Sequence, residues 1–158
     1  MINVETRSFE ETVEFGKKLG RILKPGDVIC LSGDLGTGKT ALTNGIAKEL
    51  GINSYITSPT FTLVNQYDGK HPLYHFDVYR IADPDEMFDI GFDEYISGDG
   101  ITVIEWGELI SEILPGEIIK VDIRKNLQKG LDVREISVDF RGSRYMGYET
   151  LLQQVLKR

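Results

Sequence analysis

The eight residues 33–40 constrain what this chain can fold into more than any other part of its sequence. They read GDLGTGKT and match the pattern G-x-x-x-x-G-K-[ST] at every fixed position. In such a loop the glycines let backbone N–H groups converge on phosphate oxygens, and the N-terminus of the following helix attracts the same negative charge. The loop has to connect a strand to a helix, which predicts an α/β fold that binds a nucleotide by its phosphates.

The residues on either side of this loop have the patterns of a strand and a helix. Residues 28–31 form a short unbroken apolar run, as expected for a strand that is buried on both faces of a parallel sheet. After the loop, Leu42, Ile46 and Leu50 follow one another at helical spacing, and Gly51 occupies the position of a C-terminal helix glycine. The motif thus lies in the context that it needs.

Apolar spacing and turn residues predict further elements along the rest of the chain. The first is a helix from about residue 8 to residue 23, where Ser8 and Glu11 have the S-x-x-E spacing of a helix capping pattern. The others are an antiparallel strand pair at 60–67 and 73–80, a short acidic helix from residue 84, a buried strand at 101–106, a peripheral hairpin at 117–124 and 133–140, and a C-terminal helix at 149–156. We therefore expect one P-loop NTPase domain over residues 1–158, with a mostly parallel central sheet, antiparallel additions and helices on both faces.

Composition argues against several classes of function. The 18 basic and 25 acidic residues give a formal net charge of −7, so the chain has little of the surplus positive charge that nonspecific nucleic-acid binding needs. Its one cysteine, Cys30, rules out a disulfide framework and is expected to be a buried strand residue. No apolar stretch approaches the ~20 residues that cross a bilayer, and the N-terminus lacks a signal-peptide pattern. We expect a cytoplasmic protein without membrane association.

The residues of the loop have distinct expected roles toward ATP and Mg²⁺. Lys39 is expected to reach the β- and γ-phosphates, and Thr40 to place its hydroxyl on Mg²⁺. The residues expected to bind the nucleotide around its phosphates are Gly33, Asp34, Gly36, Thr37, Gly38, Lys39, Thr40 and Ala41.

Two acidic residues in predicted strands are the candidates for the chemistry of hydrolysis, which needs a carboxylate near the metal and a group that positions water. Glu105 ends a buried strand, where a charge is costly unless a metal or a partner compensates it, so we expect it to bind Mg²⁺. Asp77 has two alternatives: it orients the water or contacts the metal shell, or it pairs with Arg80 or His75. His75 itself is expected to be structural.

Two further segments have open interpretations. Residues 58–62 (SPTFT) follow the P-loop helix, where their hydroxyls either sense metal or γ-phosphate or form an ordinary turn; Thr60 is the candidate nucleotide contact. Trp106 directly follows Glu105, so its side chain points to the opposite face, where core packing or a partner surface are the alternatives.

The ordered motifs resemble those of the TsaE family, bacterial ATPases required for making threonylcarbamoyladenosine in transfer RNA. The motifs are GDLGTGKT at 33–40, SPTFTLV at 58–64, HFDVYR at 75–80 and VIEW at 103–106. The resemblance extends over about residues 5–125, and the set is far more specific than the phosphate loop alone.

This resemblance implies an ATPase with a P-loop α/β fold that works with the TsaB and TsaD proteins. Its nucleotide turnover would support repeated cycles of modification at adenosine 37 rather than the carbamoyl transfer itself, and it would meet tRNA only through the complex. In the family pattern the positions of Lys39, Thr40, Asp77 and Glu105 serve phosphate, metal and hydrolysis. The segment that includes Ser8 and Thr12 would lie near the nucleotide base.

Three other functions are compatible with a phosphate loop. A small-molecule kinase needs an acceptor pocket and an arginine-bearing lid, but Arg80 is the one arginine between residues 51 and 104. A GTPase switch lacks N-K-x-D, and its D-x-x-G occurs only at 139–142. A nucleotide-binding scaffold differs from an ATPase in whether Asp77 and Glu105 affect turnover. With one arginine candidate, we expect hydrolysis by the chain alone to be weak and dependent on partners.

Overall fold

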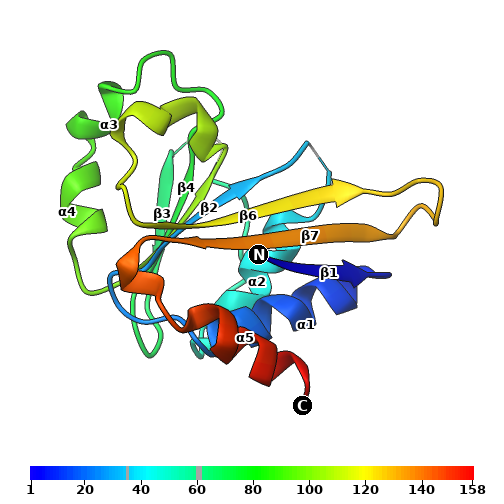
Figure 1. The fold of residues 1–158 in the computed structure, drawn as a ribbon. Coiled ribbons are helices and arrows are strands. Elements are labelled where there is room, and N and C mark those ends of the chain that lie inside the picture. The colour runs from blue at the N-terminus through cyan, green and yellow to red at the C-terminus, as the bar shows by residue number, and fades with distance from the viewer. Residues whose placement is uncertain (35, 60–61) are drawn as a thin grey trace.

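A seven-stranded sheet forms the centre of the computed structural model, which describes residues 1–34, 36–59 and 62–158 (Figure 1). The strand order is β1-β7-β6-β2-β5-β4-β3. The strands are β1 (Ile2–Thr6), β2 (Val28–Ser32), β3 (Val64–Tyr67), β4 (Leu73–Asp77), β5 (Ile101–Glu105), β6 (Ile118–Lys125) and β7 (Arg134–Arg141).

The middle of this sheet is parallel and its margins are antiparallel. β2 pairs in parallel with both β5 and β6, and β4 pairs in parallel with β5. At one margin β7 runs antiparallel to β6 and β1 antiparallel to β7, and at the other β3 runs antiparallel to β4. This arrangement confirms the predicted mostly parallel sheet with antiparallel additions.

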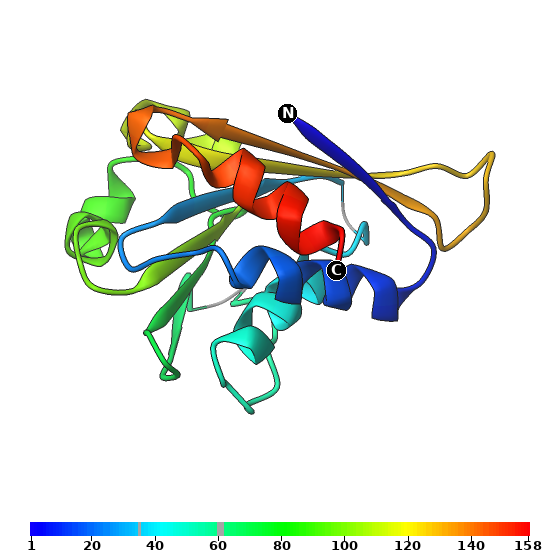
Figure 2. The same ribbon diagram turned by 60° about the horizontal axis from the view of Figure 1, so that its bottom comes forward.

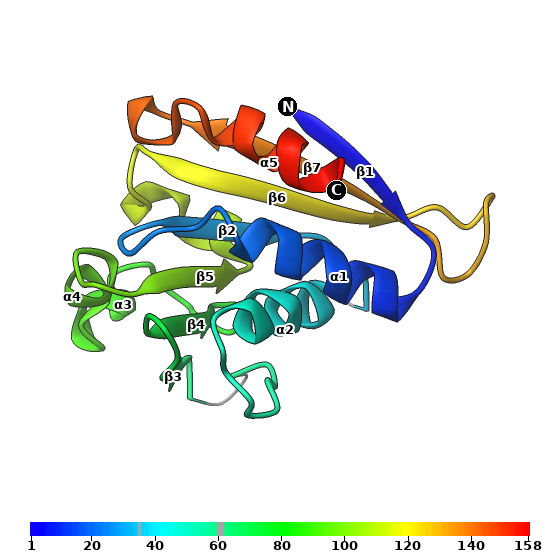
Figure 3. The same cartoon turned by 90° about the horizontal axis from the view of Figure 1, so that it is seen from below.

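Helices cover both faces of the sheet, as predicted. On one face lie α1 (Phe9–Gly20), α2 (Lys39–Glu49) and α5 (Tyr148–Leu156), which Figures 2 and 3 show side by side. Their buried residues form one core cluster with the inward side chains of the strands. The other face holds α3 (Glu86–Asp89), α4 (Phe92–Ile96) and the 3₁₀ segment Gly107–Ile113, which form a second cluster with Phe76 and Ile104.

The structure corrects the predicted elements at five places. β1 and α4 were not expected from the sequence, and the segment 117–124 is not peripheral, since β6 pairs directly with β2. The strand predicted from residue 73 to residue 80 ends at Asp77, so Tyr79 leaves the alternating face and is 49% exposed. The strand predicted at 60–67 starts at Val64; residues 60 and 61 lie outside the described residues.

A close crossing of α1 and α2 sets the distance between the N-terminal segment and the phosphate loop. A Cβ atom on Gly45 would lie 2.1 Å from the carbonyl oxygen of Val13, and one on Gly16 would lie 2.3 Å from that of Leu42. Only glycine lets the two backbones approach this closely. The crossing therefore keeps the start of α1 beside the start of α2, where the phosphate loop ends.

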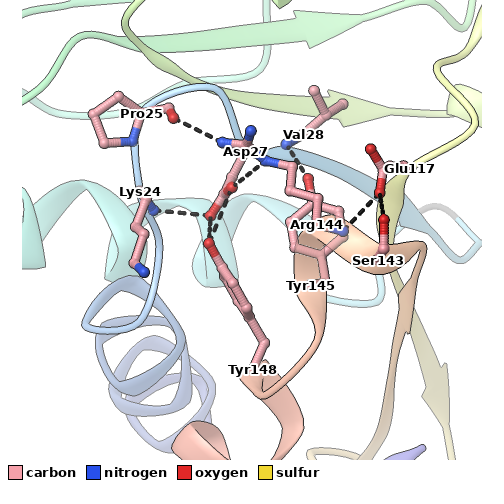
Figure 4. Close-up of polar contacts among 9 residues, drawn as sticks. All are labelled: Lys24, Pro25, Asp27, Val28, Glu117, Ser143, Arg144, Tyr145 and Tyr148. Carbon is pink, nitrogen blue, oxygen red and sulfur yellow. Dashed lines mark hydrogen bonds and ion pairs between the residues drawn. The ribbon is translucent and has the colours of Figure 1, made fainter.

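A buried carboxylate fastens the C-terminal segment to the opposite end of β2 (Figure 4). Asp27 is fully buried and accepts hydrogen bonds from the Lys24 N–H at 2.8 Å, from Arg144 Nε at 2.9 Å and from the Tyr148 hydroxyl at 2.9 Å. Next to it, the Tyr145 hydroxyl accepts from the Val28 N–H at 3.0 Å. Burial and the negative charge of Asp27 raise the pKa of Tyr148 above its usual value.

Two further findings bear on the sequence analysis. Within the described residues, none of the helices has the length and apolar character needed to cross a membrane. Cys30 lies in β2 and is 5% exposed, which confirms the buried strand position expected for it. Burial raises the pKa of its thiol to about 11.

We expect Tyr148→Phe to lower the free energy of unfolding by about 1.5–3 kcal/mol, because the ionised Asp27 loses a hydrogen bond inside the core. Tyr55→Phe removes the same hydroxyl from a ring that is 83% exposed, so its effect should stay within ~0.5 kcal/mol. Urea unfolding measures both values. Equal stabilities for the two variants would contradict this account of the Asp27 cluster.

The raised pKa of Cys30 predicts an unreactive thiol in the folded chain. With a pKa about 11, roughly one thiol in 1,000 is ionised at pH 8, and the thiolate is the reactive form. Titration with a thiol-specific chromogenic disulfide should give no fast reaction in buffer and one thiol per chain in guanidinium chloride. A fast reaction in buffer would show that Cys30 is accessible.

Candidate functional site

A cleft of about 540 Å³ lies where the carboxyl ends of β2, β4 and β5 meet the N-terminus of α2. Its position follows from the parallel pairing, because parallel strands deliver their carboxyl ends to one edge of a sheet. The residues that line it are Phe9, Gly36, Thr37, Gly38, Lys39, Thr40, Ala41, Ser58, Asp77, Tyr79, Arg80, Glu105 and Trp106.

The N-terminus of α2 presents backbone donors to this cleft. Gly38 precedes the helix with φ +112°, and no side chain of the described residues caps its first N–H groups. Gly33 begins the loop with φ +145°, and a Cβ atom there would lie 2.4 Å from the carbonyl oxygen of Ile123. The loop thus follows β6 closely before it turns into α2, and the free N–H groups with the helix dipole attract an anion.

The ammonium group of Lys39 lies inside the loop. Its Nζ donates to the carbonyl oxygens of Gly33 at 2.5 Å and Asp34 at 3.2 Å, and it sits 4.1 Å from the centre of the Trp106 ring. Burial lowers the pKa of Lys39, and the negative charges of Glu105, Glu108, Asp77 and Asp34 oppose that shift. Lys39 is therefore a desolvated cation whose backbone partners an anion in the cleft can replace.

Asp77 and Glu105 stand side by side at the ends of β4 and β5, where they are register partners. Both are buried, Asp77 being 7% and Glu105 3% exposed. The Ser58 hydroxyl donates to Asp77 Oδ2 at 2.6 Å and the Tyr79 N–H to Asp77 Oδ1 at 3.0 Å. His75 Nε2 lies 2.5 Å from Glu105 Oε2. His75, which the sequence analysis considered as a partner of Asp77, therefore pairs with Glu105 instead.

Trp106 belongs to the wall of the cleft as well as to the apolar packing. It adopts the left-handed conformation with φ +64°, and its ring centre lies 4.7 Å from that of Tyr79. The Trp106 ring packs against the core cluster that contains Phe76 and Ile104, whereas Tyr79 is half exposed, and both residues line the cleft. Core packing, one of the two alternatives considered for Trp106, therefore describes one side of the ring, and the other side faces the cleft.

The two N-terminal candidates lie on the other side of the loop. Ser8 and Thr12 line a smaller cavity of about 150 Å³ together with Gly36, Thr37 and Gly38. The Ser8 hydroxyl accepts from the Glu11 N–H at 3.1 Å and so caps α1, which confirms the predicted capping pattern. The Thr12 hydroxyl lies 2.8 Å from that of Thr6. The hydroxyls of Ser8 and Thr12 thus make hydrogen bonds in and around the first turn of α1, and both residues border the phosphate loop.

The structure separates some of the predicted nucleotide contacts from the cleft. Gly33 and Asp34 line a neighbouring cavity of about 430 Å³ with Lys125, and they reach the cleft only through their carbonyl oxygens on Lys39. Thr60, the candidate of the switch segment, lies outside the described residues, whereas Ser58 of that segment contacts Asp77.

Arg134 in β7 is a site residue that the sequence analysis missed. Its Nε donates to the carbonyl oxygen of Thr37 at 2.8 Å, and its Nη1 to that of Leu131 at 2.9 Å. Because the C=O of Thr37 and the N–H of Gly38 point in opposite directions across a trans peptide, this bond turns the Gly38 N–H away from β7. No local motif marks Arg134, since only the pairing of distant strands brings it to the loop.

The described side chains offer oxygen ligands but no complete metal cage. Thr40 and Glu105 both line the cleft, as does Asp77. In the described part of the chain, no three His, Cys, Asp or Glu side chains cluster so that they could hold a metal ion by themselves. Mg²⁺ keeps several waters and binds protein through one or two oxygen ligands plus substrate phosphates, so this donor set fits Mg²⁺ bound together with a nucleotide.

Comparison with known proteins identifies one family. The family model described as "Threonylcarbamoyl adenosine biosynthesis protein TsaE" matches residues 6–136. A protein of Bacillus subtilis named tRNA threonylcarbamoyladenosine biosynthesis protein TsaE is 47% identical over 137 residues, which cover 86% of this chain and 84% of that protein. The protein of the same name from Treponema pallidum is 45% identical over 119 residues, 75% of this chain and 88% of that protein.

A solved structure has the same architecture. The crystal structure of YdiB from Bacillus subtilis superposes with a TM-score of 0.78 at 40% sequence identity. The match covers 99% of this chain and 94% of that one. The similarity therefore extends beyond the central sheet to the N- and C-terminal segments.

We expect Arg134→Met to lower the free energy of unfolding by about 1–2 kcal/mol, because the carbonyl oxygen of Thr37 loses a charged donor in a partly buried place. Hydrogen exchange of the amides at 36–38 should also become faster. Arg141→Met is the matched control on the same strand: its exposed guanidinium pairs with Asp139 at the surface, so the change should be at most ~1 kcal/mol. Unchanged exchange at 36–38 in Arg134→Met would contradict the role given to Arg134.

Proposed function

The chain belongs to the TsaE family, and from that premise we propose that it binds ATP with Mg²⁺, hydrolyses it, and acts in tRNA threonylcarbamoyladenosine biosynthesis. The observation that supports hydrolysis is the convergence of Lys39, Asp77 and Glu105 on one cleft in front of the α2 N-terminus. The relatives named for this biosynthesis support the biological role. The modified nucleotide in this proposal is adenosine 37.

The phosphate chain of ATP would take the place next to α2. There it meets the free N–H groups at the start of the helix, and Lys39 exchanges the carbonyl oxygens of Gly33 and Asp34 for phosphate oxygens. Because burial disfavours the cation at present, a bound phosphate stabilises the charged form of Lys39 and restores its pKa toward the ordinary value. The base would lie in the small cavity that Ser8 and Thr12 border.

The Thr40 hydroxyl and the Glu105 carboxylate are the proposed protein ligands of Mg²⁺. When bound, the ion neutralises part of the phosphate charge that develops during transfer. Both side chains reach the same cleft, Thr40 from the first turn of α2 and Glu105 from the end of β5. A buried carboxylate at the end of a strand is costly, and His75 engages only its Oε2, so we assign the remaining oxygen of Glu105 to the metal.

Asp77 is the proposed group that holds the attacking water or the outer metal shell. Its two oxygens are fixed by the Ser58 hydroxyl and the Tyr79 N–H, so the carboxylate has one orientation toward the cleft. A carboxylate fixed in this way accepts a hydrogen bond from water without further reorganisation. In the reaction, water adds to the γ-phosphorus, the bond to the bridging oxygen breaks, and ADP and phosphate leave.

Partners complete the proposed function. Arg80 is the arginine that lines the cleft among the described residues, and a second positive charge for the transition state would come from a partner. We propose that TsaB and TsaD supply this environment and that the chain reaches tRNA through them. The net charge of −7 agrees with a protein that leaves the nucleic acid to its partners.

ATP hydrolysis with and without stoichiometric TsaB and TsaD tests this proposal. We expect the partners to stimulate turnover, and we expect Lys39→Ala and Glu105→Ala each to remove about 10²-fold or more of it. Lys48→Ala is the matched control, because Lys48 is exposed on the same helix outside the cleft. Turnover that survives Lys39→Ala, or that ignores the partners, would instead favour a kinase or a nucleotide-binding scaffold.

A further inference from the structure

His75 forms a buried polar pair with Glu105 that the proposed chemistry does not yet use. The imidazole is fully buried in β4, two residues before Asp77 and on the same face of the sheet. In the strand register His75 lies opposite Val103, so Glu105 is its diagonal neighbour on β5. Nε2 and Oε2 are 2.5 Å apart, which is shorter than an ordinary N–H···O hydrogen bond.

Burying the His75–Glu105 pair in the core costs free energy. His75 Nδ1 is buried and finds no hydrogen-bond partner among the residues that the structure describes. An apolar side chain of similar size would avoid the cost of burying both the imidazole and the carboxylate. Among the residues that the structure describes, the one hydrogen bond of the His75 side chain is to Glu105, so packing alone does not explain an imidazole at this position.

The direction of the hydrogen bond follows from the chemistry of the two groups. An ionised carboxylate only accepts, so Nε2 carries the hydrogen and donates it to Glu105 Oε2. Oε2 is thereby committed to the interior of the sheet, which leaves Oε1 for a ligand in the cleft that Glu105 lines.

We propose that His75 is a positioning residue that fixes the Glu105 carboxylate for Mg²⁺ and thereby sets the affinity of the site for the metal. This inference rests on the proposed function, in which Glu105 is a metal ligand. Ligating carboxylates depend on such outer hydrogen bonds, and their loss typically weakens metal binding by about 10- to 100-fold. Without the imidazole, the carboxylate turns freely and loses its single orientation toward the cleft.

The test compares ADP binding with saturating Mg²⁺ and in EDTA, both by calorimetry. The ratio of the two dissociation constants measures how strongly metal and nucleotide support each other. We expect His75→Leu to reduce this ratio by about tenfold and to leave ADP binding in EDTA unchanged. His75→Gln, which keeps an N–H donor at comparable reach, should retain most of the ratio, whereas the shorter His75→Asn should lose it.

Two further variants separate the possible failures. Thr102 in β5 is also buried, and its hydroxyl has no hydrogen-bond partner among the described residues. Thr102→Val removes this hydroxyl and should leave the ratio of the two dissociation constants unchanged. If Glu105→Gln abolishes the ratio while His75→Leu and His75→Asn preserve it, the role of His75 is wrong and the proposed function stands. If Glu105→Gln also preserves the ratio, Glu105 is not a metal ligand, and both the role of His75 and the proposed metal site are wrong. If His75→Leu does not fold, the comparison of His75→Gln with His75→Asn decides the same question.

Discussion

The parallel register of β2, β5 and β4 is the constraint on which the site depends. It places Leu31, Glu105 and Asp77 in one row, so the phosphate loop leaves β2 at the level where the two carboxylates end their strands. A shift of β5 by one residue would turn Glu105 to the opposite face, because side chains alternate along a strand. Apolar side chains buried on both faces oppose such a shift, so the core itself holds the acidic pair at the cleft.

Local patterns were sufficient to predict the parts of the molecule that depend on neighbouring residues. The strand–loop–helix unit around Lys39, the capping of α1 by Ser8 and the burial of Glu105 at a strand end all follow from short-range spacing. The mostly parallel sheet followed from the motif and from unbroken apolar runs. Sequence also placed Glu105 at the carboxyl end of a strand, but it put Asp77 inside a strand expected to run to residue 80, whereas β4 ends at Asp77.

Contacts between distant strands could not be predicted in this way. β1 is held as a strand by its pairing with β7, more than 100 residues away, and its five residues offer too short a pattern to indicate it. The same kind of pairing brings Arg134 to the phosphate loop. His75 was expected to be structural, and its bond to Glu105 depends on the register of β4 with β5, which alternation within one strand does not specify.

The two ends of β2 differ in how completely their polar groups are satisfied. At the Asp27 end, a backbone N–H, a guanidinium and a hydroxyl all donate to one carboxylate, as a stable polar network requires (Figure 4). At the cleft, Lys39 is held by carbonyl oxygens, and the start of α2 has no side-chain cap among the described residues. The positive charge of Lys39 and the N–H groups at the start of α2 attract an anion, yet Asp77 and Glu105 repel one. In the proposed function, a divalent cation resolves that conflict, because it lets a nucleotide and two carboxylates share the same cleft.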